Sequence, residues 1–143
     1  MKANIQPYKG MKKRYRKRKI EVEIEEFDTW NADYTLSLII LPLLKNYKKK
    51  SIGCFMVDKE DVPEKIHDSY DEHGFSKKAW EWTINQMIFA FDYIIDDQKL
   101  ENKLNPFDWE KDWDKWLERE KKIDDKVKRG TTLFGKYFRG IWD

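Results

Sequence analysis

Aromatic and cationic side chains alternate near the start of the chain, where they could bind an anion that carries rings. Two tyrosines stand among cations in this segment: Tyr8, Lys9, Arg14, Tyr15, Arg16 and Arg18. A tyrosine ring offers a face on which a base can stack, and a guanidinium group forks onto phosphate oxygens. We therefore predict that this segment contributes to a nucleotide-binding site, although its composition also suits a solubilising, partly disordered tail.

A second group of candidate binding residues follows in the first expected helix. Trp30, Asp33 and Tyr34 share one face of its first turn, and Lys45 lies further along. An aspartate can accept the N1 and N2 protons of a guanine edge, but an acid near a helix N-terminus is equally explained by the helix dipole. The predicted nucleotide-binding set is completed by a cation and a ring near the other end of the chain, Lys136 and Tyr137.

Residue patterns that common enzymes need are missing. The two histidines, His67 and His73, stand six residues apart in a polar segment, which is not the i, i+4 spacing of a helical metal pair. Cys54 has no histidine near it in sequence and fits a packed apolar residue. No P-loop, glycine-rich dinucleotide loop or nucleophile elbow occurs. We predict a protein that is not an enzyme and uses no metal or cofactor.

Length and composition indicate what kind of protein must position these residues. With 143 residues, the chain is expected to form one domain, and its 22 aromatic residues exclude disorder of the whole. The longest nearly apolar run, Leu36–Leu44, is far shorter than the roughly 20 residues that span a bilayer. Without a secretory signal and with a single cysteine, the expected setting is the cytosol.

Charge is distributed unevenly along the chain. Residues 1–19 hold nine of the 29 cations and none of the 27 acids, so 20 cations remain against 27 acids, a net charge of −7 for the rest. We therefore divide the chain into a basic N-terminal arm, residues 1–19, and a single helical domain, residues 20–143. Such an arm can bind phosphates, nucleic acid or an anionic membrane surface, or fold back on the acidic body.

The elements that position the candidate residues are mostly helices. Alternating apolar and acidic residues over 20–25 predict one strand, which must pair with another segment, such as 51–57, or with a second copy of the chain. Three- and four-residue apolar spacing predicts helices over 29–50, 76–99, 106–129 and 132–141. Pro42 should kink or break the first, and Gly130 should end the third. The predicted fold class is mainly α with one short N-terminal strand.

The first of these helices has almost no polar face between residues 36 and 44. It should therefore be buried on most sides. In a chain of this size, that burial is easiest if another subunit covers part of the helix, so we expect a homo-oligomer.

Four blocks of sequence resemble a widespread family of small bacteriophage proteins. The first reads W-x-x-D-x-T-L-x-x-I-I-L-P-x-L-K over Trp30–Lys45. The others are Val57–Pro63, Trp80–Phe91, and Leu133–Tyr137 with the terminal Trp142-Asp143. This family includes anti-CBASS proteins that act as sponges, binding cyclic dinucleotide signals such as 3′,3′-cyclic GMP–AMP without cleaving them. The resemblance implies a helical tetramer in the host cytoplasm, with nucleotide pockets where subunits meet.

Two other functions remain open on the sequence alone. The basic arm could bind RNA or DNA, in which case affinity should fall steeply with salt. The chain could also be a protein–protein inhibitor or a phage scaffold component, which no small ligand would stabilise. A nucleotide sponge is the leading hypothesis, because capture without cleavage accounts for the missing catalytic set.

Overall fold

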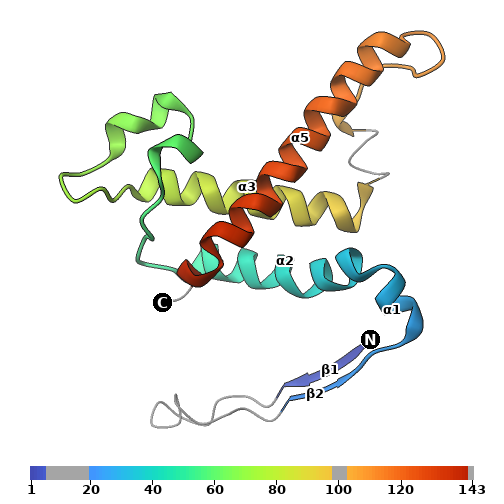
Figure 1. The fold of residues 1–143 in the computed structure, drawn as a ribbon, viewed down its shortest axis with the longest axis horizontal. Coiled ribbons are helices and arrows are strands. Elements are labelled where there is room, and N and C mark those ends of the chain that lie inside the picture. The colour runs from blue at the N-terminus through green and yellow to red at the C-terminus, as the bar shows by residue number, and fades with distance from the viewer. Residues whose placement is uncertain (6–19, 98–102, 142–143) are drawn as a thin grey trace. The chain divides into compact units, whose positions relative to one another are not determined.

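The structure is a computed structural model that describes residues 1–5, 20–97 and 103–141. It is mainly helical, with one two-stranded antiparallel sheet near the N-terminus, which confirms the predicted fold class (Figure 1). Contacts divide the chain into two compact units, Met1–Leu36 and Ser37–Asp143. The predicted nucleotide-binding residues between 6 and 19 lie outside the described residues.

The first unit contains a hairpin of strands β1 (Lys2–Ile5) and β2 (Ile20–Glu23). Lys2 lies opposite Glu23 and Ala3 opposite Val22 in the antiparallel register. The strand predicted over 20–25 is therefore present, but residues 51–57, proposed as its internal partner, contain no strand. Strand β1 was not predicted from the sequence. Its four residues, K-A-N-I, alternate polar and apolar side chains, but the stretch is short and contains only one strong strand former, Ile5.

A short helix, α1 (Glu26–Trp30), follows β2 and is separated from α2 (Ala32–Lys50) by Asn31. The Asp28 carboxylate accepts the Glu25 N–H at 2.9 Å and lies 2.7 Å from the amine of Met1. These two bonds, the Met1 bond above all, lower the pKa of the Asp28 carboxyl. The predicted helix 29–50 is thus two helices, and its first turn belongs to α1.

A kink or a break was expected at Pro42; helix α2 continues through this residue, so the helix is not broken there. Pro42 faces solvent, as does Leu38, whose side chain is 45% exposed, so water can bond the carbonyl that the proline leaves without a donor. The expectation that α2 is buried on most sides is also wrong for the single chain. Leu41 and Leu44 are buried, but Leu43 is 62% exposed.

The second unit is built on a crossing of two long helices, α3 (Lys77–Ile95) and α5 (Trp113–Tyr137) (Figure 1). Ser76 caps α3, as predicted, by accepting the Ala79 N–H at 3.0 Å. The 3₁₀ segments η2 (Lys59–Asp61) and η3 (Glu64–Ser69) precede α3, and η4 (Phe138–Gly140) follows α5.

Helix α5 replaces two predicted helices, 106–129 and 132–141, because Gly130 lies inside it rather than at its end. A Cβ atom at Gly130 would clash with the Gln86 carbonyl oxygen and the Ala90 Cβ of α3. Glycine is therefore needed here for the close approach of two helices and not for a turn. The predicted start at 106 is also wrong: the side chain of Asn105 instead donates to the Trp116 carbonyl at 3.1 Å, and the helix begins at Trp113.

The core of the second unit is centred on Trp80, which is 3% exposed. Its ring lies edge-on to Tyr47 of α2 and Tyr137 of α5, at 6.2 and 6.3 Å between centroids, and tilted against Phe55. The four rings join α2, α3, α5 and the segment after α2 in one cluster. Among the described helices, none has the length and apolar character needed to cross a bilayer.

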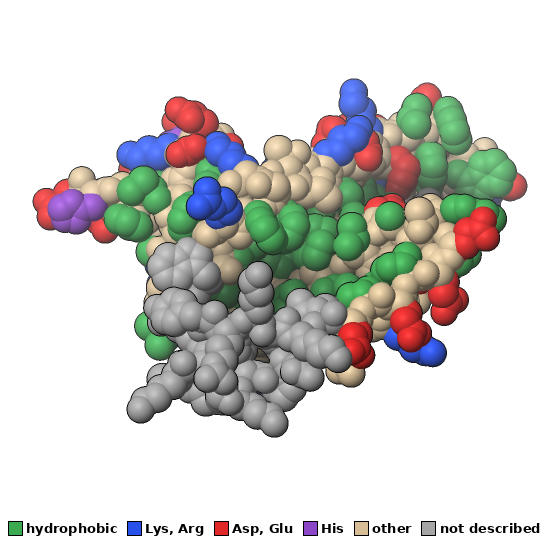
Figure 2. All heavy atoms as spheres, turned by 60° about the horizontal axis from the view of Figure 1, so that its bottom comes forward, with side chains coloured by type: hydrophobic (Ala, Val, Ile, Leu, Met, Phe, Trp, Pro, Cys, Tyr) green, Lys and Arg blue, Asp and Glu red, His purple; other side chains and the backbone are tan. Residues whose placement is uncertain are grey.

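Apolar side chains are also abundant on the surface. Figure 2 shows groups of hydrophobic side chains at the surface, beside charged side chains of both signs. In the first unit, Phe27 and Trp30 are 64% and 74% exposed. Exposed apolar residues grouped in this way are typical of surfaces that bind a partner.

Candidate functional site

A groove that can accept a small molecule lies in the second unit, between the C-terminal half of α2 and the end of α5. Its volume is about 670 Å³, within the range of roughly 300–1,000 Å³ typical of small-molecule sites. The lining residues are Ile40, Leu43, Leu44, Asn46, Tyr47, Lys50, Phe134, Phe138, Arg139 and Ile141. We call this the α2–α5 groove.

Three aromatic rings line the α2–α5 groove. Phe134 packs edge-on against Phe91 of α3, with 4.9 Å between centroids, so its position is fixed by the core. Phe138 lies 5.5 Å from Phe134 and is 61% exposed. The groove thus combines a fixed ring with a neighbouring ring that is open to a flat ligand.

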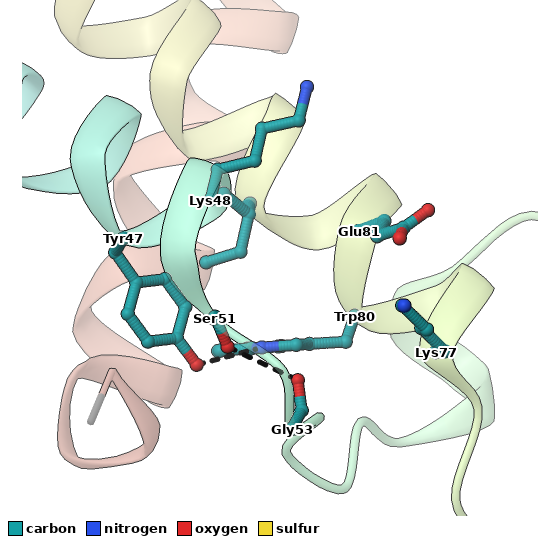
Figure 3. A pocket seen from close by; sticks show the side chains of 8 residues that line it. Tyr47, Lys48, Ser51, Gly53, Lys77, Trp80 and Glu81 are labelled. Carbon is teal, nitrogen blue, oxygen red and sulfur yellow. Dashed lines mark hydrogen bonds between the residues drawn. The ribbon is translucent and has the colours of Figure 1, made fainter. Parts of the chain in front are cut away.

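The third ring belongs to Tyr47, whose orientation is set by a hydrogen bond. The indole Nε1 of Trp80 donates to the Tyr47 hydroxyl at 3.1 Å, which is drawn in Figure 3. Lys48, Ser51 and Lys77 surround a cavity of about 30 Å³ on that side, large enough for about one water molecule. This small cavity cannot hold a nucleotide.

The polar groups of the α2–α5 groove are two cations and one amide. Lys50 ends α2 and Arg139 lies in η4; both side chains are exposed, and neither forms a salt bridge within the described part of the chain. Asn46 adds one amide that can both donate and accept hydrogen bonds. No carboxylate is among the described lining residues, although the chain has 27 acids. An anion with aromatic rings therefore fits the groove chemically.

The predicted site residues that the structure describes are not brought together in this groove. Trp30, Asp33 and Tyr34 belong to the first unit, where Trp30 is 74% exposed. Lys45 belongs to the second unit, and its Nζ pairs with Asp92 Oδ1 of α3 at 3.0 Å.

Lys136 and Tyr137 form a network with two aspartates of the loop that contains η2. Lys136 Nζ lies 2.7 Å from Asp58 Oδ2 and 2.6 Å from Asp61 Oδ2. The Tyr137 hydroxyl donates to Asp61 and accepts the Asp58 N–H at 2.9 Å. Burial and the bond to Asp61 raise the pKa of Tyr137 to about 12. Both side chains therefore fasten the loop to α5.

Sequence reasoning missed the residues that line the groove. Phe134, Phe138 and Ile141 lie in the segment predicted as a helix over 132–141, and Lys50 lies at the end of the helix predicted over 29–50; none of them was predicted as a binding residue. The available signal was a ring followed directly by a cation, Phe138-Arg139, just after the fourth matched block. That signal could not be used without knowing that α2 packs beside it.

The described residues include no group of three or more His, Cys, Asp or Glu side chains placed to hold a metal ion. His67 Nε2 lies 2.8 Å from the Lys59 carbonyl oxygen, so its ring holds the loop of η2 and η3. No protein-family model matches this sequence, and no match to a curated protein or to a solved structure was found.

Proposed function

We propose that the protein is a sponge that binds a cyclic dinucleotide, such as 3′,3′-cyclic GMP–AMP, in the α2–α5 groove and does not cleave it. By withholding this signal in the host cytoplasm, it would prevent activation of CBASS defence effectors. The observation that carries the proposal is the lining of the groove, which combines the exposed Phe138 ring and apolar side chains with Lys50 and Arg139, two cations that form no salt bridge among the described residues.

A base and the phosphates of a cyclic dinucleotide have counterparts in the groove. Phe138 offers a stacking face for a base, and an asparagine such as Asn46 can bond an adenine edge. Arg139 can bind a phosphate through two N–H groups, and Lys50 adds a point charge. An apolar wall lowers the local dielectric and strengthens these charge contacts.

A second copy of the chain would complete the site. Leu43 lines the groove and is nevertheless 62% exposed, and Leu38 of the same helix is 45% exposed. A cyclic dinucleotide has two phosphates and two bases, so an interface related by a two-fold axis can supply a ring and a cation to each half. We propose a homo-oligomer, with a tetramer as the expected state, that covers this part of α2.

Capture rather than catalysis is favoured by the side chains around the ligand. Proton transfer and nucleophilic attack on a phosphodiester need groups such as His, Cys, Asp or Glu within hydrogen-bond reach. None of these residue types is among the described residues that line the groove. The ligand should therefore leave chemically unchanged.

The test combines binding with recovery of the ligand. The full chain is incubated with 3′,3′-cyclic GMP–AMP, and ligand is quantified by chromatography before and after heat denaturation of the protein. We expect the ligand to be withheld before heating and recovered intact afterwards. Linear products would show hydrolysis and overturn the sponge, as would a melting temperature and a free-ligand level that cyclic dinucleotides leave unchanged.

Substitutions of groove residues test whether the cyclic dinucleotide binds in the α2–α5 groove. Phe138→Ala and Arg139→Gln should each weaken binding at least tenfold, about 1.4 kcal/mol. The matched controls are Trp109→Ala, which removes a ring that is 60% exposed elsewhere, and Lys121→Gln, which removes an exposed cation on the outside of α5. Equal affinity of the groove variants and the controls would place the ligand elsewhere on the protein.

A further inference from the structure

A second surface of the second unit combines rings and cations, and it begins on α3. Trp82, Phe89 and Tyr93 are spaced by seven and four residues, so they share one side of the helix. All three side chains are half-buried. The rings of Phe89 and Tyr93 stack, with 6.3 Å between centroids and 24° between planes.

A row of cations follows one side of α5 with spacings of four and three residues. Its members are Lys115, Arg119, Lys122, Lys126 and Arg129. Fourteen residues of helix separate the first from the last, which corresponds to a length of about 21 Å at 1.5 Å per residue. Lys115 pairs with Asp112 and Lys122 pairs with Glu118. Both are exposed bridges, at i, i+3 and i, i+4 spacing, and such bridges contribute little to stability.

The two rows meet where Lys126 lies over Phe89, with 3.7 Å between Nζ and the ring centroid. Lys126 is half-buried, and burial together with the charges of Arg129 and Arg119 lowers its pKa. Arg129 is exposed and has no salt bridge among the described residues. Arg119 uses Nε to bond the Leu104 carbonyl at 2.8 Å, and it forms no salt bridge within the described part of the chain. Positive charge is thus crowded beside an aromatic stack, an arrangement that a bound anion would relieve.

The row on α3 leads toward a further cleft beside Trp82. This cleft has a volume of about 410 Å³ and is lined by Lys65, Ile66, Lys78, Glu81, Trp82 and Asn85. Two lysines therefore stand beside this ring, against one carboxylate among the described lining residues. The combination of ring and cation at Phe89 recurs here, seven residues away along α3.

We infer that this face of α3 and α5 binds single-stranded nucleic acid. The rings of Trp82 and Tyr93 provide stacking positions for bases, Phe89 supports the Tyr93 ring from beneath Lys126, and the row on α5 follows the phosphates. Stacked rings beside a basic track are how proteins hold single strands without reading their sequence. A duplex, whose bases are already stacked, can use only the cations. This site is separate from the α2–α5 groove and does not depend on the sponge activity.

The experiment measures binding of the full chain to a fluorescein-labelled 12-nucleotide oligo(dT) by anisotropy at several salt concentrations. We expect the double variant K126Q/R129Q to bind at least tenfold more weakly. It should also reduce the salt slope by about 1.4, since each phosphate contact on a single strand contributes about 0.7. The matched control is K121Q/K128Q, which removes the same charge from the opposite side of α5 and should retain most of the affinity.

The ring requirement is tested with Phe89→Leu, which keeps an apolar side chain beside Lys126 but removes the ring that supports Tyr93. We expect weaker oligo(dT) binding with an unchanged salt slope. The inference is overturned if the wild-type chain does not bind the strand, or if both double variants lose affinity equally, which would indicate attraction by total charge. Equal affinity for a duplex of the same length would also overturn it. Saturating 3′,3′-cyclic GMP–AMP should leave the strand bound, which separates this result from the fate of the sponge proposal.

Discussion

The hydroxyl of Tyr137, in the last turn of α5, donates a hydrogen bond to the carboxylate of Asp61 and accepts one from the backbone of Asp58 at 2.9 Å. Replacing Tyr137 by Phe leaves the ring in the core but removes both bonds. Because the Asp58 N–H and the Asp61 carboxylate then lose a partner, we expect the free energy of unfolding to fall by about 1–3 kcal/mol. Urea denaturation measures this, with Tyr34→Phe, an exposed tyrosine, as the control.

The same loop should make stability depend on acid pH. Although burial alone would raise the pKa of Asp61, the bonds from Lys136 and Tyr137 hold it below its ordinary value of 3.8. The unfolded chain therefore takes up this proton more readily than the folded chain, and the contribution to stability is present above pH 3.8 and lost as the pH falls through the lowered pKa.

Asp61→Asn tests this pH dependence, since it removes the titrating group. The difference in unfolding free energy between the wild type and Asp61→Asn should be largest near neutral pH and should shrink as the pH approaches 3. A difference that stays constant over this range would show that the charge of Asp61 does not stabilise the loop.

Two glycines of α5 should respond to alanine in opposite directions. At Gly130 the added Cβ meets the Gln86 carbonyl and Ala90, so the helices must separate, and we expect a loss of about 1–3 kcal/mol. At Gly135 no such atom lies within 4 Å, and alanine should stabilise the helix by up to about 1 kcal/mol. Thermal unfolding of the two variants compares them within a single helix. Similar effects at both positions would contradict the close crossing of α3 and α5.

Lys45, chosen from the sequence as a ligand-binding cation, should prove replaceable. Its pair with Asp92 is 53% and 44% exposed, and exposed pairs contribute at most about 1 kcal/mol. We expect Lys45→Gln to change stability by less than that amount and to leave cyclic dinucleotide affinity within about twofold of the wild type, because the side chain does not line the α2–α5 groove. Isothermal titration calorimetry gives the affinity, and a tenfold loss would restore Lys45 to the site.

Local sequence patterns predicted those helices and strands whose structure is determined by their own residues. Helix α3 followed from its apolar spacing and its Ser76 cap, and β2 from its alternation. The wrong predictions concern positions where a contact with a distant segment of the chain determines the structure. Gly130 has the sequence signature of a helix end, yet its lack of a side chain serves a contact with Gln86, which lies in another helix.

The candidate site was less predictable than the fold for a related reason. Lys45 and Lys136 have the right chemistry for phosphate, but each bonds an aspartate that lies far away in the sequence. Conversely, Phe138 and Arg139 line a groove only because α2 packs beside the end of α5. Residue type indicates which side chains can bind an anion, whereas pairing in the folded chain decides which of them remain available.

The core of the second unit joins Leu41 and Leu44 of α2 to Leu133 and Tyr137 of α5, almost a hundred positions later. At translation rates of about 5–20 residues per second, α2 leaves the ribosome roughly 5–20 s before its partner exists. During that interval the partner of the nascent apolar helix is missing, so chaperones that bind exposed apolar segments can reach the helix. The strands and α1, by contrast, lie within the first 36 residues and can assemble as soon as they emerge.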